Sequence, residues 1–397
     1  MKQPKTEAIH TNISYHEDAQ LLVKWVEAMH PIFHLNEQPP CYAPRRNDYL
    51  EATIAPMARW SFLAASMKYL AALHDGHMGS GLIDHASKYL AIDVIYSNGK
   101  LYTAKDGVAQ DEITAICDAP TQNIFKAIDE LTYAENEFAR IRLYERMCRL
   151  PQFLMYAGCV PMDNPIITLG NRKQEIPLAP RNQHAINADY IIKCKQDDDV
   201  FIIDLRSFAY HSSVSDACAQ IKKAISDGTL KFIIDLRGNG GGNSGVGEDL
   251  LNAMGMVPPL YGMHLIVSDY VVGRTNGAVP ENLINYFAPD TTCAIANENI
   301  KLAVLTDTDT FSSARMFGVW VQDGNFGTVI GSPSCNAPNA YGDMTPFMLP
   351  LSGQYVQISR KKFYRPDVNA DPNVLWPDIM VNPGEDAMTR ALEFMKD

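Results

Sequence analysis

The stretch "KFIIDLRGNGGGNSG" (residues 231–245) runs from an apolar strand into a glycine-rich loop, and a helix is expected after it at 246–255. A similar apolar segment, "VFIIDLR" (200–206), lies upstream. Between them, residues 214–228 have apolar positions at helical spacing and end at a glycine. Strands that are apolar throughout and joined by a helix are typical of a parallel sheet covered on both faces. The residues around FIIDLR do not repeat, which favours similar composition over duplication.

The same pattern continues toward the C-terminus. "IKLAVLTD" (300–307) predicts a third buried strand, followed by a helix at 312–323 and a short strand at 327–331. Residues 347–359 predict a hairpin that turns at Ser352-Gly353. Residues 183–397 are therefore expected to form an α/β core domain.

Two smaller units are expected before this core. Residues 15–35 and 47–74 have helical periodicity and predict an N-terminal helical domain, residues 1–84. Residues 85–182 predict a small α+β module. It begins with a hairpin that turns at Asn98-Gly99. Two helices (121–132 and 135–157) and strand-like residues at 164–178 follow.

Composition narrows the class of protein. Hydrophobic residues make up 46% and charged residues 20%, as in soluble globular proteins, and the net charge is -12. An acidic chain lacks the basic surface that nucleic acids require, so no nucleic-acid partner is expected. No apolar run is long enough to span a bilayer.

The cysteines and the N-terminus bear on location. The eight cysteines are scattered without a CxxC pair, so neither a zinc cluster nor a dithiol redox site is expected. The N-terminus lacks the apolar segment of a signal peptide. The scattered cysteines and the missing signal segment favour a cytoplasmic location, or an exported protein if a leader has been removed.

A serine pair stands in "TDTDTFSSARMFGVWVQDG" (306–324), where the strand gives way to the helix. Free backbone N–H groups at a helix N-terminus favour negative charge, which suits an acyl-transfer nucleophile and its oxyanion. An ordinary N-cap serine would look the same in isolation. In the loop 238–242, four of five residues are glycine, and such a loop can bind a phosphate or an oxyanion. It is not a P-loop, because no Gly-Lys-Ser/Thr follows.

A histidine pair follows the second helical segment, in "ALHDGHMGSG" (72–81). His74 and His77 lack the carboxylate-histidine helix motif of a zinc site, so no metal is expected. A general base for a serine is the sharper interpretation of His77, although a loop histidine is often only solvated.

Together these segments resemble the C-terminal processing (tail-specific) serine peptidases. "FIIDLRGNGGGNSG", "VLTDTDTFSSARMFGVWVQDG" and "VIGSPS" are similar to the family's core motifs. "LHDGH" resembles the branch that contains the tricorn core and the chlamydial protease-like activity factor. The resemblance covers most of the chain. It implies a ClpP/crotonase-like spiral core, and it places the module at 85–182 where relatives carry a PDZ domain, so a degenerate PDZ-like fold is expected there.

The resemblance also implies roles for individual residues. It makes Ser312 the nucleophile and His77 the general base. The backbone N–H of Ser313, with that of Gly240 or Gly241, would form the oxyanion hole.

Two residues of this sequence differ from those that the family carries at the same positions. The first is the acid expected to orient the histidine. The glutamate that precedes the late "PDI" in the Ser-His branch is replaced here by Asp371, the expected orienting acid. An acidic residue three positions after the nucleophile is replaced by Arg315. No lysine occurs between Ser312 and Lys361, which disfavours a Ser-Lys dyad.

The sequence therefore predicts a serine endopeptidase that acts on peptides or proteins through Ser312, His77 and Asp371, with no cofactor. Two alternatives stay open. One is an inactive peptide-binding or scaffold homologue, and the other is a crotonase-like enzyme acting on thioesters. The oligomeric state and the natural substrate are not given by the sequence.

Overall fold

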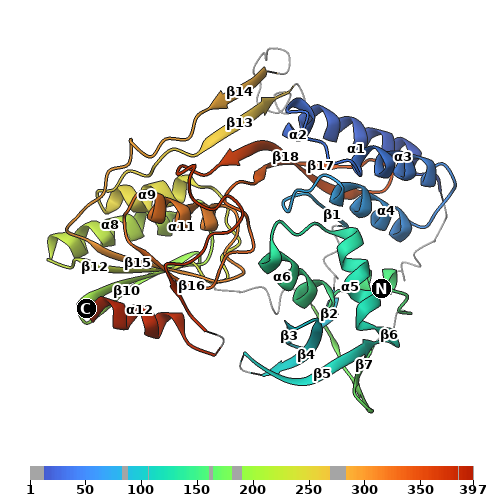
Figure 1. Ribbon diagram of the computed structural model, residues 1–397, viewed down its shortest axis with the longest axis horizontal. Coiled ribbons are helices and arrows are strands. Elements are labelled where there is room, and N and C mark those ends of the chain that lie inside the picture. The colour runs from blue at the N-terminus through green and yellow to red at the C-terminus, as the bar shows by residue number, and fades with distance from the viewer. Residues whose placement is uncertain are drawn as a thin grey trace, which may run out of the picture.

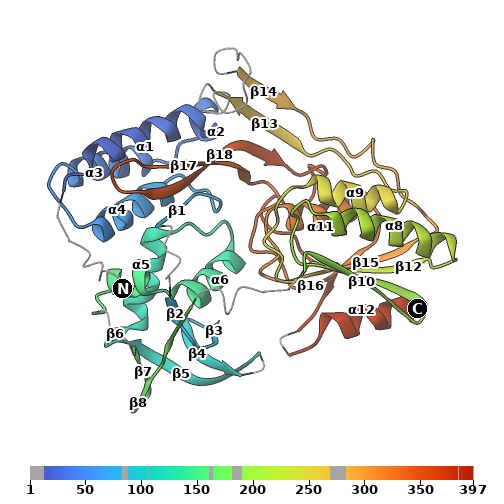
Figure 2. The ribbon, with the colours of Figure 1, turned by 180° about the vertical axis from the view of Figure 1, so that it is seen from behind.

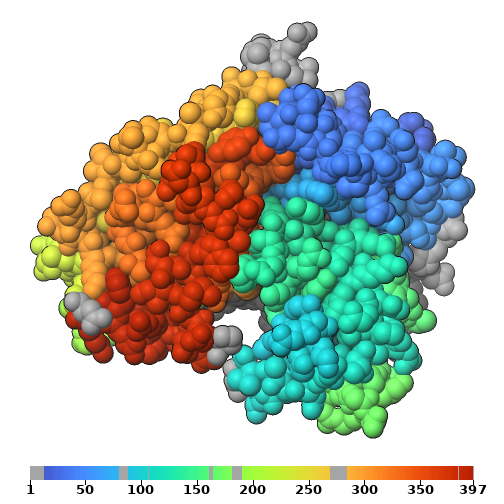
Figure 3. Space-filling view, in the orientation of Figure 1, coloured from blue at the N-terminus to red at the C-terminus, as the bar shows by residue number. Residues whose placement is uncertain are grey.

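The computed structural model describes residues 13–82, 88–105, 107–160, 164–180, 190–268, 283–382 and 384–396. The chain has a mixed α/β fold in which an α/β core, an N-terminal helical layer and a small module lie against one another (Figures 1 and 3). In the described part, no helix is both long and apolar enough to cross a membrane.

The core is built on a six-stranded sheet of order β10-β11-β12-β15-β16-β19, parallel except at its β10 edge. Its strands are β10 (Ile192–Asp197), β11 (Val200–Leu205), β12 (Lys231–Asp235), β15 (Lys301–Thr306), β16 (Thr328–Gly331) and β19 (Ile379–Met380). Its helices are α8 (Ser212–Ser226), α9 (Gly245–Ala253), α11 (Ser313–Asp323) and α12 (Ala387–Lys396).

Both faces of this sheet are covered, as the apolar strands predict. Ile203 and Leu205 of β11 pack with α8, α9 and α11, whereas Val200 and Ile202 pack in a second cluster with α12. Figure 1 shows these helices on opposite sides of the sheet. The parallel arrangement brings the ends of β12 and β15 to one edge, where the glycine loop and the serine pair follow.

A second, antiparallel sheet supports the helical layer. Its order is β1-β18-β13-β14, and β17 also pairs with β18. The strands are β1 (Gly79–Leu82), β13 (Gly262–Val267), β14 (Leu283–Phe287), β17 (Tyr341–Met348) and β18 (Gln354–Tyr364). The helices are α1 (His16–Met29), α2 (Pro31–His34), α3 (Tyr42–Ala52) and α4 (Arg59–Ala71). Phe347, Val356 and Ile358 share an apolar cluster with these helices, so the N-terminal layer folds onto C-terminal strands (Figure 2).

The small module has its own apolar cluster around Leu101, Ile113 and Ile167. Its strands are β3 (Val94–Ser97), β4 (Lys100–Lys105), β5 (Val108–Ile116), β6 (Ala119–Pro120), β7 (Ile166–Leu169) and β8 (Arg172–Glu175), with β2 (Lys88–Leu90) paired to β9 (Leu178–Pro180). The helices are α5 (Thr121–Leu131), α6 (Glu137–Met147) and α7 (Pro151–Tyr156). The predicted hairpin turn is confirmed, since Ser97 pairs with Lys100 across Asn98-Gly99.

The predicted helices are shorter than expected where proline interrupts them. The segment 15–35 divides into α1 and α2 at Pro31, and the segment 135–157 divides into α6 and α7 at Pro151. The stretch 47–74 also contains two helices, α3 and α4, with Pro56 between them. Proline has no N–H to continue a helix, so it begins a new one more easily than it extends the last.

Candidate active site

Ser312 stands immediately before α11 in a backbone conformation that is rare for a residue with a side chain. Its φ is 53° and its ψ is -122°. Asn336 holds this conformation, because its Oδ1 accepts the Ser312 N–H at 2.8 Å. Such conformations persist only where the surrounding structure enforces them, and they gather at active sites. An ordinary N-cap serine would not need this geometry.

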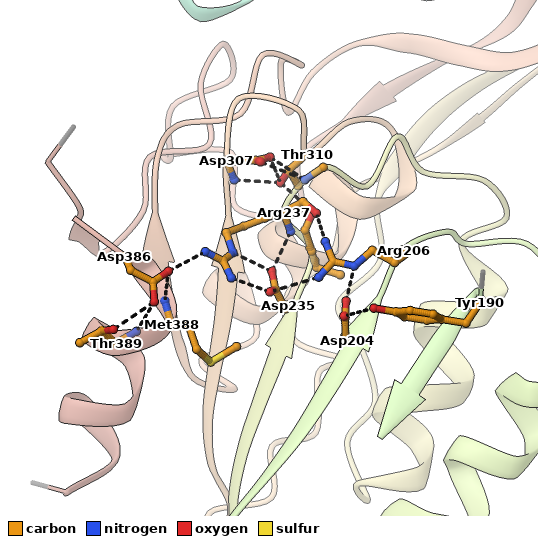
Figure 4. Close-up of polar contacts among 12 residues, drawn as sticks. Tyr190, Asp204, Arg206, Asp235, Arg237, Asp307, Thr310, Asp386, Met388 and Thr389 are labelled. Carbon is orange, nitrogen blue, oxygen red and sulfur yellow. Dashed lines mark hydrogen bonds and ion pairs between the residues drawn. The ribbon is translucent and has the colours of Figure 1, made fainter. Parts of the chain in front are cut away.

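The glycine loop packs directly against Ser312. A Cβ on Gly241 would lie 2.7 Å from Ser312 Cβ and 2.8 Å from Ser313 N, and the φ of Gly241 is +93°. Only glycine therefore suits this position. The other end of the loop is held by Asp307, whose two carboxylate oxygens accept the Gly238 N–H at 3.0 and 2.9 Å (Figure 4).

The two FIIDLR segments meet in an ion-pair network beneath this loop (Figure 4). Buried Asp235 accepts hydrogen bonds from Arg237 Nε at 2.9 Å and Arg237 Nη2 at 2.8 Å, and it pairs with Arg206 Nη2 at 3.4 Å. Arg206 also pairs with Asp204, and Arg237 Nη1 pairs with Asp386 at 3.0 Å. The similar sequences thus place matching arginines at the carboxyl ends of two adjacent strands.

Two of the predicted oxyanion donors, Gly241 and Ser313, lie close together, but Gly241 is already engaged. The Gly241 N–H donates to Asn239 Oδ1 at 2.9 Å. Ser313 is the first residue of α11, where a backbone N–H has no partner within its own helix. Its hydroxyl donates to the Gly242 carbonyl at 2.7 Å and so ties the helix start to the loop. Ser313 and Gly240 therefore remain the candidates for the oxyanion donors.

His77 lies on the turn after α4 and is almost completely buried. Gln357 of β18 donates to its carbonyl at 2.8 Å, and the Phe311 ring packs 4.6 Å from its imidazole, measured between centroids. His77 and Ser312 line the same cavity, of about 770 Å³. The structure therefore brings the predicted base and nucleophile, which are far apart in sequence, to one site.

Two buried carboxylates approach His77 Nδ1. Asp75 Oδ1 is 3.8 Å away and Glu135 Oε1 is 3.9 Å away. Within the described residues Nδ1 has no hydrogen-bond partner. Asp75 is held by His30, whose Nε2 lies 3.1 Å from Asp75 Oδ2. Sequence reasoning missed Glu135, because nothing in "TYAENEF" marks it as more than the first residue of an expected helix.

The same three side chains have spacing that a metal ion would accept, since their ligand atoms lie within 4.8 Å of one another. Both carboxylates already accept backbone hydrogen bonds: Asp75 from His77 N at 2.7 Å, and Glu135 from Gly76 N at 3.1 Å. A metal would have to compete with these bonds.

The structure does not bring Asp371 to His77, so the expected orienting acid needs correction. Asp371 Oδ2 accepts the Trp376 indole N–H at 2.9 Å, and Oδ1 accepts the backbone N–H groups of Asn373 and Val374 at 2.8 and 3.3 Å. The carboxylate closes its own turn near the surface. A short side chain can satisfy this local role, which the sequence pattern alone did not reveal.

Burial shifts the pKa values in opposite directions at this site. Burial lowers the pKa of His77 to about 4, against the charge of Asp75 and with a further contribution from Arg315. Burial also raises the pKa of Glu135 to about 7, and the negative charge of Asp75 adds to this. For Asp75, burial alone would raise the pKa, but the His30 hydrogen bond and charge outweigh it and the pKa is lowered. A lowered pKa leaves the His77 imidazole uncharged near neutral pH.

Arg315, which departs from the family pattern, is buried within the site. Its Nη1 donates to Tyr261 Oη at 2.8 Å and to the Pro338 carbonyl at 2.9 Å, and its Nε donates to Asn336 Oδ1 at 3.2 Å. Asn336 therefore links Arg315 to the Ser312 backbone. The arginine therefore supports the turn that carries Ser312.

Comparison with known proteins points to a family of peptidases. The sequence model of peptidase family S41 matches residues 199–381, which include the glycine loop, Ser312 and Asn336. The chain carries a peptidase family S41 domain. It is thus a peptidase, a hydrolase of the family to which C-terminal processing peptidases belong. A search of curated proteins found no match.

Solved structures extend the similarity of this S41 peptidase to almost its whole length. Mature CPAF has a TM-score of 0.68 and 14% identity, and the match covers 96% of this chain and 95% of CPAF. Mature CPAF complexed with lactacystin has the same score and identity over 96% and 97% of the two chains. The photosystem II D1 C-terminal processing protease has a TM-score of 0.50 at 14% identity over 94% of both chains. At these identities the likeness concerns the fold.

Proposed function

We propose that this chain is a serine endopeptidase in which Ser312 is the nucleophile and His77 the general base. The observation that carries the proposal is the strained backbone of Ser312, which stands at the start of α11 in the cavity that His77 also lines. A strained serine between a strand and a helix exposes its Oγ to substrate.

The chemistry follows from these positions. Ser312 Oγ attacks the peptide carbonyl while His77 accepts its proton, giving a tetrahedral intermediate. The N–H groups of Ser313 and Gly240 stabilise the oxyanion, and Gly241 allows the loop to approach closely. His77 returns the proton to the leaving amine, and water then hydrolyses the acyl-enzyme by the same route. Because the pKa of His77 is lowered to about 4, the resting base is uncharged at neutral pH.

The proposal extends to the parts around the site. The parallel sheet and its helices suit a ClpP/crotonase-like core, and the position of the module suits a degenerate PDZ-like fold. The cavity combines apolar residues such as Met316 and Phe363 with polar ones such as Asn243 and Asp343, which suits a peptide or protein segment as substrate.

Covalent labelling with a fluorophosphonate probe tests the function. We expect the wild type to be labelled, Ser312→Ala to lose labelling, and His77→Ala to react at least about 100-fold more slowly. Ser313→Ala separates the two serines: it keeps the backbone N–H and loses only the hydroxyl bond to Gly242, so it should keep its label. A folded wild type that is not labelled would favour an inactive peptide-binding homologue. Acyl-CoA binding without a covalent serine adduct would favour the thioester enzyme.

A further inference from the structure

We propose that Glu135, supplied by the small module, is the residue that orients His77 and stabilises its imidazolium while Ser312 is acylated. This inference rests on the proposed function. Glu135 would act through His77 and is therefore a positioning residue. It takes the role that the sequence assigned to Asp371.

Glu135 is tied to the loops that carry both the base and the nucleophile. Its Oε1 accepts the Gly76 N–H at 3.1 Å, next to His77. Its Oε2 accepts Asn336 Nδ2 at 2.6 Å and the Ala337 N–H at 2.9 Å. Asn336 in turn accepts the Ser312 N–H. One carboxylate thus sets the position of the histidine loop (residues 75–77) relative to the nucleophile turn (residues 307–312).

The histidine loop is shaped to admit this carboxylate. A Cβ on Gly76 would lie 2.8 Å from Glu135 Oε1, so the glycine between Asp75 and His77 makes room for it. Glu135 Oε1 is 3.9 Å from the buried Nδ1 of His77, which has no partner in the described part of the chain. A movement of roughly 1 Å would complete an N–H···O bond of normal length. Catalytic hydrogen bonds are often long before substrate binds.

Asp75 lies equally near, but the oxygen that it presents to His77 already accepts a shorter hydrogen bond than Glu135 Oε1 does. Its Oδ1 accepts the backbone N–H of His77 at 2.7 Å, and its Oδ2 is held by His30. Glu135 Oε1 accepts only the longer bond from Gly76. Asp75 therefore shapes the loop, whereas Glu135 Oε1 has a lone pair available for the imidazole N–H.

The charges around Glu135 make this role depend on pH. Asp75 and His77 face it from the histidine loop, Arg315 from α11, Cys335 from the loop before Asn336, and Tyr133 from its own segment. Burial and Asp75 raise the pKa of Glu135 to about 7, against the hydrogen bonds from Ala337 and Asn336 and the charge of Arg315. Ionisation near pH 7 would turn the Glu135 carboxyl into a charged carboxylate, which is the hydrogen-bond acceptor that the Nδ1–H of His77 needs. The acylation rate should then increase with pH through about 7, well above the lowered pKa of His77.

The rate of fluorophosphonate labelling, measured between pH 5 and 9, tests the proposal. Glu135→Gln should react about 100-fold more slowly than wild type at pH 8 and lose the increase through pH 7. Glu135→Asp should recover part of the rate and keep a pH-dependent increase. The matched control is Glu145→Gln, a partly buried carboxyl of the same module whose pKa burial also raises, and it should react like wild type. Circular dichroism and thermal melting establish that each variant is folded.

Other results would overturn the assignment. If Glu135→Gln keeps the wild-type rate and pH increase, or if the increase disappears only in Asp75→Asn or Asp371→Asn, Glu135 is not the orienting residue.

A second measurement separates this inference from the proposed function. In Ser312→Ala, which cannot be acylated, NMR of the His77 ring should show a hydrogen-bonded Nδ1–H whose signal responds to pH near 7. Adding Glu135→Gln should remove that response. A ring signal unchanged by Glu135→Gln would overturn the inference even if labelling is efficient. A ring response without labelling of the wild type would overturn only the proposed function.

Discussion

Gly241 packs directly against Ser312, so this pair gives the most local prediction. Gly241→Ala places a methyl group 2.7 Å from Ser312 Cβ at a φ of +93°. We expect fluorophosphonate labelling to slow by roughly 100-fold, because a displacement of about 1 Å at the nucleophile can cost that much.

Gly228→Ala is the matched control for this prediction. Gly228 has a φ of +98° at the end of α8, but a Cβ there meets no atom within 4 Å. Both variants should lose about 1 kcal/mol of stability from the unfavourable φ, whereas only Gly241→Ala should lose activity. Equal labelling rates in the two variants would show that the contact with Ser312 is unimportant.

Ionisation of Glu135 should lower the free energy of unfolding as pH rises, independently of any effect on activity. Its pKa is raised from 4.5 to about 7 in the folded state, so the folded protein binds its proton more tightly than the unfolded chain. The stabilisation from this proton is present below about pH 4.5 and is lost as pH rises through 7. Glu135→Gln has no proton to release at this position, so its stability does not fall with pH for this reason. The variant's free energy of unfolding, relative to wild type, should therefore increase by on the order of 2 kcal/mol between pH 4.5 and 8.

Urea unfolding at several pH values measures this difference. A constant offset between the two proteins would mean that the introduced glutamine only exchanges hydrogen bonds and that Glu135 titrates normally. Glu112→Gln, at an exposed surface pair with Lys100, provides a reference in which little pH dependence is expected.

At the scale of elements, the junction of β11 and β12 depends on Asp235. Asp235→Asn removes the acceptor shared by Arg206 and Arg237 and leaves two arginines competing for fewer partners (Figure 4). We expect a loss of roughly 3 kcal/mol in the free energy of unfolding, at the low end for buried ion pairs because both arginines are partly exposed. Chemical denaturation measures it.

An exposed pair on α8 is the control for Asp235. Lys223 and Asp227 lie at i and i+4 with side chains 73% and 57% exposed. Asp227→Asn should change stability by less than about 1 kcal/mol. A similar small effect at Asp235 would indicate that solvent screens the network completely.

The sequence predicted the elements better than their ends. Strands such as β12 and β15 are recognisable because they are buried on both faces and apolar throughout, and the turn at Asn98-Gly99 has residues that favour positive φ. Helix ends at Pro31 and Pro151 were missed because apolar periodicity continues across them.

The site could be predicted only where motif and geometry coincide. Ser312 and His77 lie in motifs, and the structure places both at one cavity. Glu135 lies in no motif, and its position depends on how one unit packs on another. Asp371 has a spacing that resembles the family, but its carboxylate is used by the local turn and by Trp376. Side-chain partners of this kind are set by tertiary contacts, which a single sequence does not encode locally.

At the scale of the whole molecule, the proposed active site draws on three parts of the chain, which lie against one another in Figures 1 and 2. The helical layer supplies His77, the core supplies Ser312, and the module supplies Glu135. The module contacts the nucleophile turn through Asp309, which pairs with Arg142 and, at 3.2 Å, with Arg146 of α6. The docking of the module should therefore control activity at a distance from the reacting atoms.

Asp309→Asn tests this coupling, because it weakens two charged contacts between the module and the core without changing a residue that touches Glu135 or His77. We expect labelling to slow by about tenfold, since Glu135 would be held less firmly at His77. Hydrogen exchange should accelerate at the amides of Gly76 and Ala337, both of which donate to Glu135.

Asp111→Asn, which removes an exposed ion pair with Arg172 within the module, should change neither exchange nor labelling. If Asp309→Asn also leaves both unchanged, other contacts must hold the module, foremost the Asn136 side chain, which donates to the carbonyls of Ser334 and Asn373. Faster exchange with an unchanged labelling rate would be more informative still. It would mean that the site tolerates a mobile Glu135, and the role proposed for that carboxylate would have to pass to Asp75, which belongs to the same loop as His77 and does not depend on docking.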